Sequence, residues 1–383
     1  MHNASICVSS QIGNDSVYGA VTPPLYLSST YKFKALDGMG KYDYGRGGNP
    51  NRDALAITVA DMEGGKGAVV TSSGMAAIDL VLNLLPPNAL VIAPHDCYGG
   101  THRLLKSRQS QGRIRVLFIN QNSERALERA LDEKPALVFI ETPSNPLMRV
   151  YDIQALSSAA HKVGALVVCD NTFLSPARQH PLKLGADIVV HSSTKYINGH
   201  SDVVGGIVVA KDEAMAEQLA WWANCTGVTG APFDSFLTLR GLRTLHARMD
   251  AQETNAQKIA EFLHDHDFVS KVYYPGLKSD AGYDLAQKQQ SGPGAMLSFE
   301  LSCDRDGVGR FLAHTSLFQF AESLGGTESL ICHPASMTHR AMSAEARKLA
   351  GISETLIRLS VGLEHSNDQL AELSHYFQNL SKQ

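Results

Sequence analysis

Short apolar runs alternate with amphipathic stretches through the middle of the chain, from about residue 51 to residue 250. The runs are rich in β-branched side chains and predict buried strands, and the stretches between several of them have the apolar spacing of helices. The predicted strands are Gly67–Thr71, Leu90–Ala93, Arg115–Ile119, Leu137–Glu141, Leu166–Cys169, Ile188–His191 and Gly206–Val209, and the predicted helices include Gly74–Leu85 and Thr101–Gln109. This alternation is typical of a mostly parallel sheet covered by helices on both faces.

The two ends of the chain have different patterns. Residues 1–50 show no sustained period and contain Pro23-Pro24 and a glycine-rich run over 38–50. Such a segment is a poor core and predicts an arm that packs on another surface, including that of another subunit. After about residue 253 strands and helices follow without strict alternation, which indicates a smaller α+β domain. We therefore predict an arm over 1–50, an α/β domain over 51–252 and an α+β domain over 253–383.

The composition narrows the class of protein. The chain has 383 residues, 44% of them hydrophobic and 19% charged, with a net charge of −4. These values are those of an ordinary globular protein, and no basic stripe indicates nucleic-acid binding. The most apolar region, 76–93, is interrupted by Asp79, Asn83 and Pro86-Pro87, so no membrane span is predicted. The six cysteines lack Cys-x-x-Cys spacing, which disfavours a metal site and favours a reducing, cytoplasmic location.

The residues directly after the predicted strands carry the candidate chemistry, because ligands of such folds gather at the carboxyl ends of the strands. Lys195 follows the strand that ends at His191, where partial desolvation suits a Schiff-base amine. Asp170 ends another apolar strand, and a buried carboxylate needs a partner. Taken singly, Asp170 as a helix cap and Tyr98 as a core aromatic are the simpler interpretations. A separate explanation of this kind at every strand end is less simple than one shared site.

A lysine and an aspartate in these positions meet the needs of pyridoxal 5'-phosphate. The aspartate keeps the pyridine nitrogen protonated, so that the ring accepts electrons from a substrate carbanion. The helix start at Gly74 and Met75 offers N–H groups to a phosphate, with hydroxyls from Ser192 and Thr194. Tyr98 can stack on the ring. The first strand is not followed by a Gly-x-Gly-x-x-Gly motif, which disfavours a dinucleotide. From spacing alone, Tyr44 and Arg46 lie in a flexible loop.

The motifs taken together resemble the cysteine/methionine-metabolism family of pyridoxal-phosphate enzymes. They occur in family order along essentially the whole chain: Tyr44-Gly-Arg46-Gly-Gly-Asn-Pro50, Ser73-Gly-Met75-Ala-Ala-Ile78, Asp96-Cys-Tyr98-Gly-Gly100, Glu141-Thr-Pro-Ser-Asn-Pro146, Asp170-Asn-Thr-Phe173, Ser192-Ser-Thr-Lys-Tyr196-Ile-Asn-Gly-His200, Ala321-Glu-Ser-Leu-Gly-Gly326 and Arg358-Leu-Ser-Val-Gly362. The resemblance implies an aspartate-aminotransferase-like fold (fold type I) and a homotetramer built from tight dimers.

The resemblance also assigns roles. Lys195 is the implied Schiff-base lysine and, with Tyr98, a catalytic residue, and Asp170 is the partner of the pyridine nitrogen. The implied cofactor contacts are Gly74, Met75, Tyr98, Asn145, Ser192 and Thr194, together with Tyr44 and Arg46 from the neighbouring subunit, which replaces the loop interpretation of the arm. Arg358 takes the substrate carboxylate with a bidentate fork. The other implied substrate contacts are Arg103, Glu322, Ser323, Asn224 and Tyr44.

Within the family, the segments Ala220-Trp-Trp-Ala-Asn224 and Gly227-Val-Thr-Gly230 favour γ-replacement. The expected reaction makes L-cystathionine from an O-acyl-L-homoserine, with O-succinyl preferred, and L-cysteine, in methionine biosynthesis. Gly47 stands where some members carry a second arginine, which leaves the acyl group open, and Asn51 replaces a usual threonine. The alternatives are γ-elimination from cystathionine, O-acylhomoserine sulfhydrylation, and a non-enzymatic small-molecule binding protein on the same scaffold.

Overall fold

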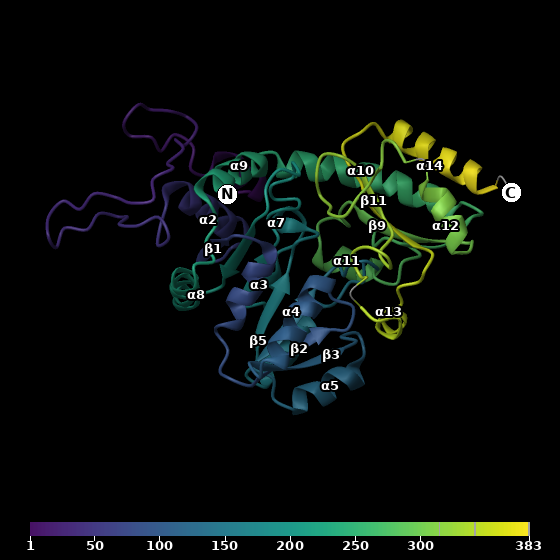
Figure 1. The fold of residues 1–383 in the computed structure, drawn as a ribbon, viewed down its shortest axis with the longest axis horizontal. Helices are drawn as coiled ribbons and strands as arrows, with labels where there is room; N and C mark the ends of the chain where they lie inside the picture. The colour runs from purple at the N-terminus through teal and green to yellow at the C-terminus, as the bar shows by residue number, and fades with distance from the viewer. Residues whose placement is uncertain (314, 341, 382–383) are drawn as a thin grey trace. The chain divides into compact units, whose positions relative to one another are not determined.

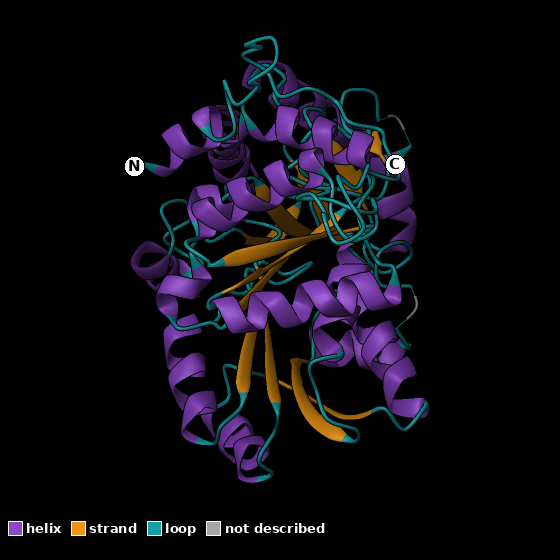
Figure 2. Cartoon of the chain, turned by 90° about the vertical axis from the view of Figure 1, so that its left-hand side faces the viewer, coloured by secondary structure: helices purple, strands orange, loops and turns teal. Residues whose placement is uncertain are grey.

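The computed structural model describes residues 1–313, 315–340 and 342–381, which form two compact units (Figures 1 and 2). The first unit comprises Met1–Pro86 and Val167–His246, and the second comprises Pro87–Leu166 and Ala247–Gln383. Among the described residues, no helix has the length and apolar character needed to cross a membrane. The boundaries of these two units differ from those of the predicted arm and two domains. That predicted division stays a prediction.

The first unit contains both ends of the predicted α/β domain and the N-terminal segment. Its elements are α1 (Asn3–Ser9), α2 (Pro50–Glu63), β1 (Gly67–Thr71), α3 (Gly74–Leu82), β5 (Leu166–Asp170), α7 (Ser175–Arg178), the 3-10 helix η1 (Pro181–Leu184), β6 (Ile188–His191), β7 (Gly206–Ala210), α8 (Glu213–Thr226), α9 (Pro232–Leu242) and the first turn of α10 (Leu245–His264). The predicted strands in this part of the chain are confirmed, with ends that differ by at most one residue.

The strands of the first unit lie in the order β1-β7-β6-β5. Strands β5 and β6 are parallel, whereas β7 runs antiparallel to both β6 and β1. Every residue of β6 and β7 is buried. Full burial on both faces explains why these strands read as continuous apolar runs and not as alternating ones. Strand β7 is thus the one reversed strand among the four described in this unit.

Two helices of this unit begin with side-chain caps that the sequence supplies. The side chain of Asn49 accepts the N–H groups of residues 51 and 52, and Pro50 occupies the first turn of α2. Ser73 caps α3 by accepting the N–H of Ala76 at 3.1 Å. Gly64 ends α2 with φ of 78°, the left-handed conformation that glycine adopts without steric cost. The caps place the start of α3 directly after β1.

The N-terminal segment differs from its prediction in one respect. Its first residues form α1, which is too short to show a helical period and was not expected from the sequence. The Sγ of Cys7 donates to the carbonyl of Leu242 at 2.7 Å, so this helix is fixed by a distant partner. From there to α2 the chain forms a long loop that extends away from α2 and β1 (Figure 1). Many of its apolar side chains are exposed, including Tyr18, Leu27 and Leu36.

The second unit contains two groups of strands. Its elements are β2 (Ala89–Pro94), α4 (Gly99–Ser110), β3 (Ile114–Ile119), α5 (Glu124–Asp132), β4 (Leu137–Glu141), α6 (Ile153–Lys162), most of α10, β8 (Val269–Tyr273), α11 (Tyr283–Gln289), β9 (Met296–Leu301), α12 (Arg305–Leu312), β10 (Gln319–Phe320), β11 (Leu330–Cys332), α13 (Ala344–Ala350), β12 (Leu356–Ser360) and α14 (Ser366–Ser381). Strands β4, β2 and β3 pair in parallel, and the others follow the order β10-β11-β12-β9-β8.

The second of these sheets holds Arg358 at its centre. Strand β12 pairs antiparallel with both β11 and β9, and all of its residues are buried. Packed aromatic rings cover the sheet, with Phe311 of α12 within 6.0 Å of Phe299 and 5.4 Å of Tyr376, centroid to centroid. Helix α10 begins at Leu245, before the predicted domain boundary near residue 253, and its Leu245 and Met249 are buried. A charged residue in such a strand needs buried polar partners.

Candidate functional site

Lys195 follows β6 in a tight turn, as predicted. Its N–H donates to the carbonyl of Ser192 at 3.2 Å, and its carbonyl accepts the N–H of Gly199 at 2.7 Å. Gly199 has φ of 70°, and the neighbouring Tyr196 is fully buried. The turn therefore holds the lysine backbone rigidly at the carboxyl end of a buried strand, while the residue itself keeps partial exposure.

Asp170 ends β5 beside the strand that leads to Lys195. In the parallel pair, Asp170 lies opposite Val190. Its Oδ1 accepts the N–H of Thr172 at 2.9 Å. Burial raises the pKa of the Asp170 carboxyl above its usual value, and the hydrogen bonds from Thr172 and the nearby His191 only partly offset this. A cationic ligand at this carboxyl would stabilise its charged form, which is what a protonated pyridine nitrogen provides.

The predicted phosphate contacts come together at the start of α3. A Cβ on Gly74 would lie 2.7 Å from the Cβ of Ser192, so only glycine allows the helix start to approach the β6 loop this closely. The first N–H groups of a helix have no acceptor within it and favour anions. The hydroxyl of Thr194 is engaged with Gly205, donating to its carbonyl at 3.2 Å and accepting its N–H at 3.0 Å. Gly74, Met75 and Ser192 thus fit a phosphate directly, whereas Thr194 already supports the loop.

Three predicted residues of the arm and of α8 meet within the same chain. The Nε of Arg46 donates to Oδ1 of Asn224 at 2.9 Å, and its guanidinium carbon lies 5.5 Å from the centre of the Tyr44 ring. Tyr44 is 50% exposed. Arg46 and Tyr44 therefore lie at an accessible surface of the first unit, and their role toward a neighbouring subunit stays a prediction.

Tyr98 and Asn145 are held by one buried carboxylate in the second unit. Oε2 of Glu141 accepts the N–H of Tyr98 at 2.8 Å, and Oε1 accepts the N–H of Asn145 at 3.2 Å. The Tyr98 residue is 40% exposed. Glu141 ends strand β4, so the strand end itself fixes the loop before α4 and the loop after β4. The sequence motifs contained Glu141, but gave it no role.

Arg358 presents a partly satisfied guanidinium. Its Nη1 donates to Oδ1 of Asn145 and its Nη2 to the carbonyl of Ser323, both at 2.9 Å. Its Nε is buried and has no hydrogen-bond acceptor among the described residues. Arg358 is 2% exposed, and such a group favours an anionic ligand that restores its pairing. The structure thus brings Asn145, Ser323 and Arg358 together, as a carboxylate site requires.

Two other residues predicted to contact the substrate, Arg103 and Glu322, do not bond to Arg358 within the part of the chain that the structure describes. Arg103 on α4 and Glu322 beside Ser323 are exposed, and neither forms a hydrogen bond or ion pair with Arg358 among the described residues. Their substrate roles stay predictions.

A buried network that sequence analysis did not single out supports Asn145. Asp96 accepts hydrogen bonds from Ser144 Oγ at 2.9 Å, Arg149 Nη1 at 2.6 Å and Tyr151 Oη at 2.8 Å. His339 contacts the carbonyl of Asn145 through Nε2 at 3.1 Å. Burial, with the charge of Arg358, lowers the pKa of His339 to about 4, so its ring is neutral near pH 7. These partners lie far apart along the chain and leave no local signal.

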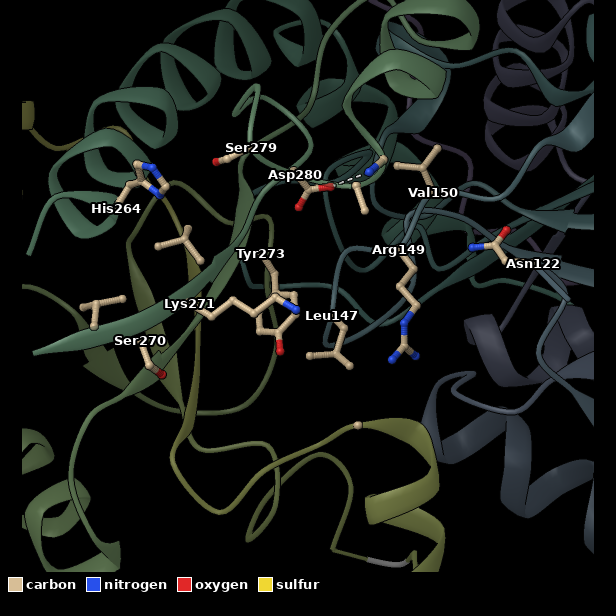
Figure 3. A pocket seen from close by; sticks show the side chains of 15 residues that line it. Asn122, Leu147, Arg149, Val150, His264, Ser270, Lys271, Tyr273, Ser279 and Asp280 are labelled. Atoms are coloured by element: carbon tan, nitrogen blue, oxygen red, sulfur yellow. Dashed lines mark hydrogen bonds between the residues drawn. The ribbon is translucent and has the colours of Figure 1, made fainter.

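A pocket of about 600 Å³ lies in the second unit (Figure 3). Arg149, Lys271, Tyr273 and Asp280 are among its lining residues, and Oδ1 of Asp280 accepts the N–H of Gly282 at 2.7 Å. None of the predicted site residues lines it. Arg149 therefore connects this pocket to Asp96, but the candidate chemistry lies elsewhere.

The fold, the lysine at the end of β6 and the acid at the end of β5 define a pyridoxal-phosphate-dependent enzyme. Residues 4–378 match the family described as Cys/Met metabolism PLP-dependent enzyme, and the chain belongs to that family. Its cofactor is pyridoxal 5'-phosphate. The orphaned donor of Arg358, the desolvated Asp170 and the glycine that lets α3 approach Ser192 fit this cofactor and an amino-acid substrate.

The similar proteins narrow the family further. The chain is 54% identical to cystathionine gamma-synthase of Escherichia coli, over 99% of this chain and 98% of that protein. It is 45% identical to cystathionine beta-lyase of Lactococcus lactis, over 94% of this chain and 95% of that one. The fold matches crystal structures of cystathionine gamma-synthase from Xanthomonas oryzae pv. oryzae with a TM-score of 0.98 and 52% identity, covering 99% of this chain and 98% of that chain. Those structures contain aminoacrylate and cysteine, or cystathionine. The predicted family, fold class and cofactor are confirmed.

Proposed function

We propose that this chain makes L-cystathionine from an O-acyl-L-homoserine and L-cysteine by γ-replacement. The observation that carries the proposal is the near full-length similarity to cystathionine gamma-synthases, at 54% identity to the Escherichia coli protein. The Xanthomonas oryzae relative was crystallised with cystathionine and with cysteine, the product and one substrate of this reaction. The sequence features that favour γ-replacement, around Asn224, agree with it.

Each residue of the site has a task in this reaction. Arg358 binds the substrate α-carboxylate through the donors that Asn145 and Ser323 do not occupy, and so fixes the substrate in one orientation. The Nζ of Lys195 removes the Cα proton of the substrate as a general base, and in a later step it donates a proton back to a carbon atom as a general acid. Tyr98 holds the ring plane, and Gly74, Met75 and Ser192 hold the phosphate.

The cofactor, when bound, accepts the electrons that the substrate carbon releases. Asp170 sustains this by keeping a negative charge against the pyridine nitrogen. Because its carboxyl is desolvated, the charge of Asp170 acts in a low-dielectric surrounding, where such an interaction is stronger than in water.

The decisive experiment mixes purified protein with O-succinyl-L-homoserine or O-acetyl-L-homoserine, with and without L-cysteine, and separates the amino-acid products. Cystathionine that forms only when an ester and cysteine are both present supports the proposal, and the faster ester identifies the acyl group that Gly47 leaves open. Sulfide in place of cysteine tests the sulfhydrylase alternative. Cysteine and 2-oxobutyrate released from cystathionine, with no synthesis from either ester, would replace the proposal with a γ-lyase.

The second part of the proposal is a homotetramer in which Tyr44 and Arg46 reach the site of a neighbouring subunit. The exposed apolar residues of the arm, among them Tyr18, Leu27 and Leu36, support it, because burying such side chains against another subunit is favourable. Co-expression of a Lys195→Ala chain with an Arg46→Ala chain tests the shared site. Mixed oligomers should recover part of the activity that each variant lacks alone. Activity that stays at the level of the separate variants would contradict the sharing.

The proposed location is the cytoplasm. None of the described cysteines forms a disulfide, and Cys7, Cys97, Cys169 and Cys332 are buried, which suits a reducing compartment. Fractionation of the source cells with an antibody to this chain tests the proposal.

A further inference from the structure

Glu63 and His191 form a buried pair in the first unit, next to the residues proposed to bind the cofactor. The Nε2 of His191 lies 2.7 Å from Oε1 of Glu63, and both side chains are completely inaccessible. A fully buried carboxylate is costly unless several donors satisfy it, so its presence calls for an explanation. Glu63 ends helix α2, which comes from a different part of the chain from either strand end.

Glu63 binds both strand ends at once. The same Oε1 that contacts His191 also accepts the Nδ2 of Asn171 at 2.9 Å. Asn171 directly follows Asp170, and His191 directly precedes Ser192. One carboxylate oxygen therefore ties the residue after the predicted pyridine partner to the residue before the predicted phosphate ligand.

Other hydrogen bonds between the two loops complete this link. The N–H of Ser192 donates to Oγ1 of Thr172 at 2.9 Å, and the N–H of Asn171 donates to the carbonyl of Val190 at 3.0 Å. Gln179 donates from Nε2 to Oδ1 of Asn171 at 3.0 Å. The loops after β5 and β6 are thus cross-linked, and Glu63 joins both of them to helix α2.

We infer that Glu63 is a positioning residue for the cofactor: through its hydrogen bonds to Asn171 and His191 it fixes the distance between Asp170 and Ser192. A pyridine ring and its phosphate are rigidly connected, so a protein that binds both ends needs a fixed spacing between the two partners. This inference rests on the proposed binding of the cofactor by Asp170 and Ser192.

The test measures the dissociation constant of pyridoxal 5'-phosphate for the full-length chain, after removal and re-addition of the cofactor. Glu63→Ala removes the oxygen that accepts both hydrogen bonds, and should raise this constant about tenfold or more. Asp61→Asn is the matched control, since it removes an exposed carboxylate from the same helix and should leave the constant within about twofold. At saturating cofactor, the KM for the ester should stay unchanged, because Arg358 is not touched.

A second pair of variants covers the case in which Glu63→Ala does not fold. His191→Ala removes one of the two hydrogen bonds and should weaken cofactor binding about tenfold, whereas His191→Gln keeps a donor at this position and should restore most of the affinity. A cofactor dissociation constant unchanged in Glu63→Ala or His191→Ala would overturn the inference, and so would a His191→Gln variant as weak as His191→Ala. If Asp170→Asn and Lys195→Ala also left the constant unchanged, the proposed cofactor site itself would fail.

Discussion

Asn145 and Arg358, 213 positions apart in the sequence, are joined by a hydrogen bond of 2.9 Å from Nη1 of the arginine to the amide oxygen of the asparagine. Arg358 lies in a central strand, and Asn145 in a loop held by Glu141. The arginine fork is therefore oriented before any substrate arrives. Pre-orientation of this kind lowers the entropy that substrate binding has to overcome.

Replacing Asn145 by alanine should weaken substrate binding more than it affects folding. The change removes one acceptor from a buried guanidinium, and hydrogen bonds to charged groups contribute about 1.5–3 kcal/mol, so kcat/KM for the ester should fall roughly tenfold to a hundredfold. Steady-state kinetics with varied ester measures it. Asn120→Ala, at an exposed position, is the control and should behave as the wild type. An unchanged KM and kcat would show that Arg358 needs no orientation from Asn145.

Replacing Glu141 by glutamine should destabilise the two loops that carry Tyr98 and Asn145. The carboxylate accepts one backbone N–H with each oxygen, and an amide group can accept with only one of them. A buried N–H left unpaired costs about 1–3 kcal/mol. The thermal midpoint should therefore decrease relative to the wild type. Glu133→Gln, which alters a carboxylate 52% exposed, serves as the comparison and should leave the midpoint nearly unchanged.

The stability of the cofactor-free protein should depend on Asp170 in a defined pH range. Burial raises the pKa of this carboxyl in the folded state, so the folded protein favours the protonated carboxyl. The stability that Asp170 contributes is therefore complete below its usual pKa of 3.8 and is lost as the pH rises through its pKa in the folded state. Cofactor-free Asp170→Asn should thus be more stable than the wild type at neutral pH, with a difference that shrinks in acid. Thermal unfolding from pH 5 to pH 8 measures this. A wild type that is the more stable at every pH would contradict the prediction.

His339 should make the protein sensitive to mild acid. Its pKa is lowered to about 4 from 6.5, so full stability is present above pH 6.5 and is lost progressively as the pH falls toward 4. Between pH 7 and pH 5 this group accounts for about 2 kcal/mol of destabilisation. His339→Gln should show a smaller loss over the same range in urea unfolding. Equal losses in both proteins would assign the acid sensitivity to other groups.

Several parts of the fold were predictable because their signals are local. Strands β1 and β6 have the predicted ends, since buried strands must be continuously apolar and end where polar residues begin. Lys195 and Asp170 stood out for the same reason, as polar residues directly after such runs. Helix α1 was not predictable, because a helix of about two turns is too short to show a period, and it is fixed by a contact with Leu242.

The sequence by itself determined the family and the cofactor and singled out Lys195 and Asp170 as candidates, because each depends on residue type and order along the chain. Only the tertiary structure decided which side chains support them. Glu63 beneath Asn171 and His191, and Asn145 against Arg358, are contacts between residues 108 or more positions apart. A buried charge is stable only where the fold brings donors to it from such distances, and no local pattern encodes that meeting.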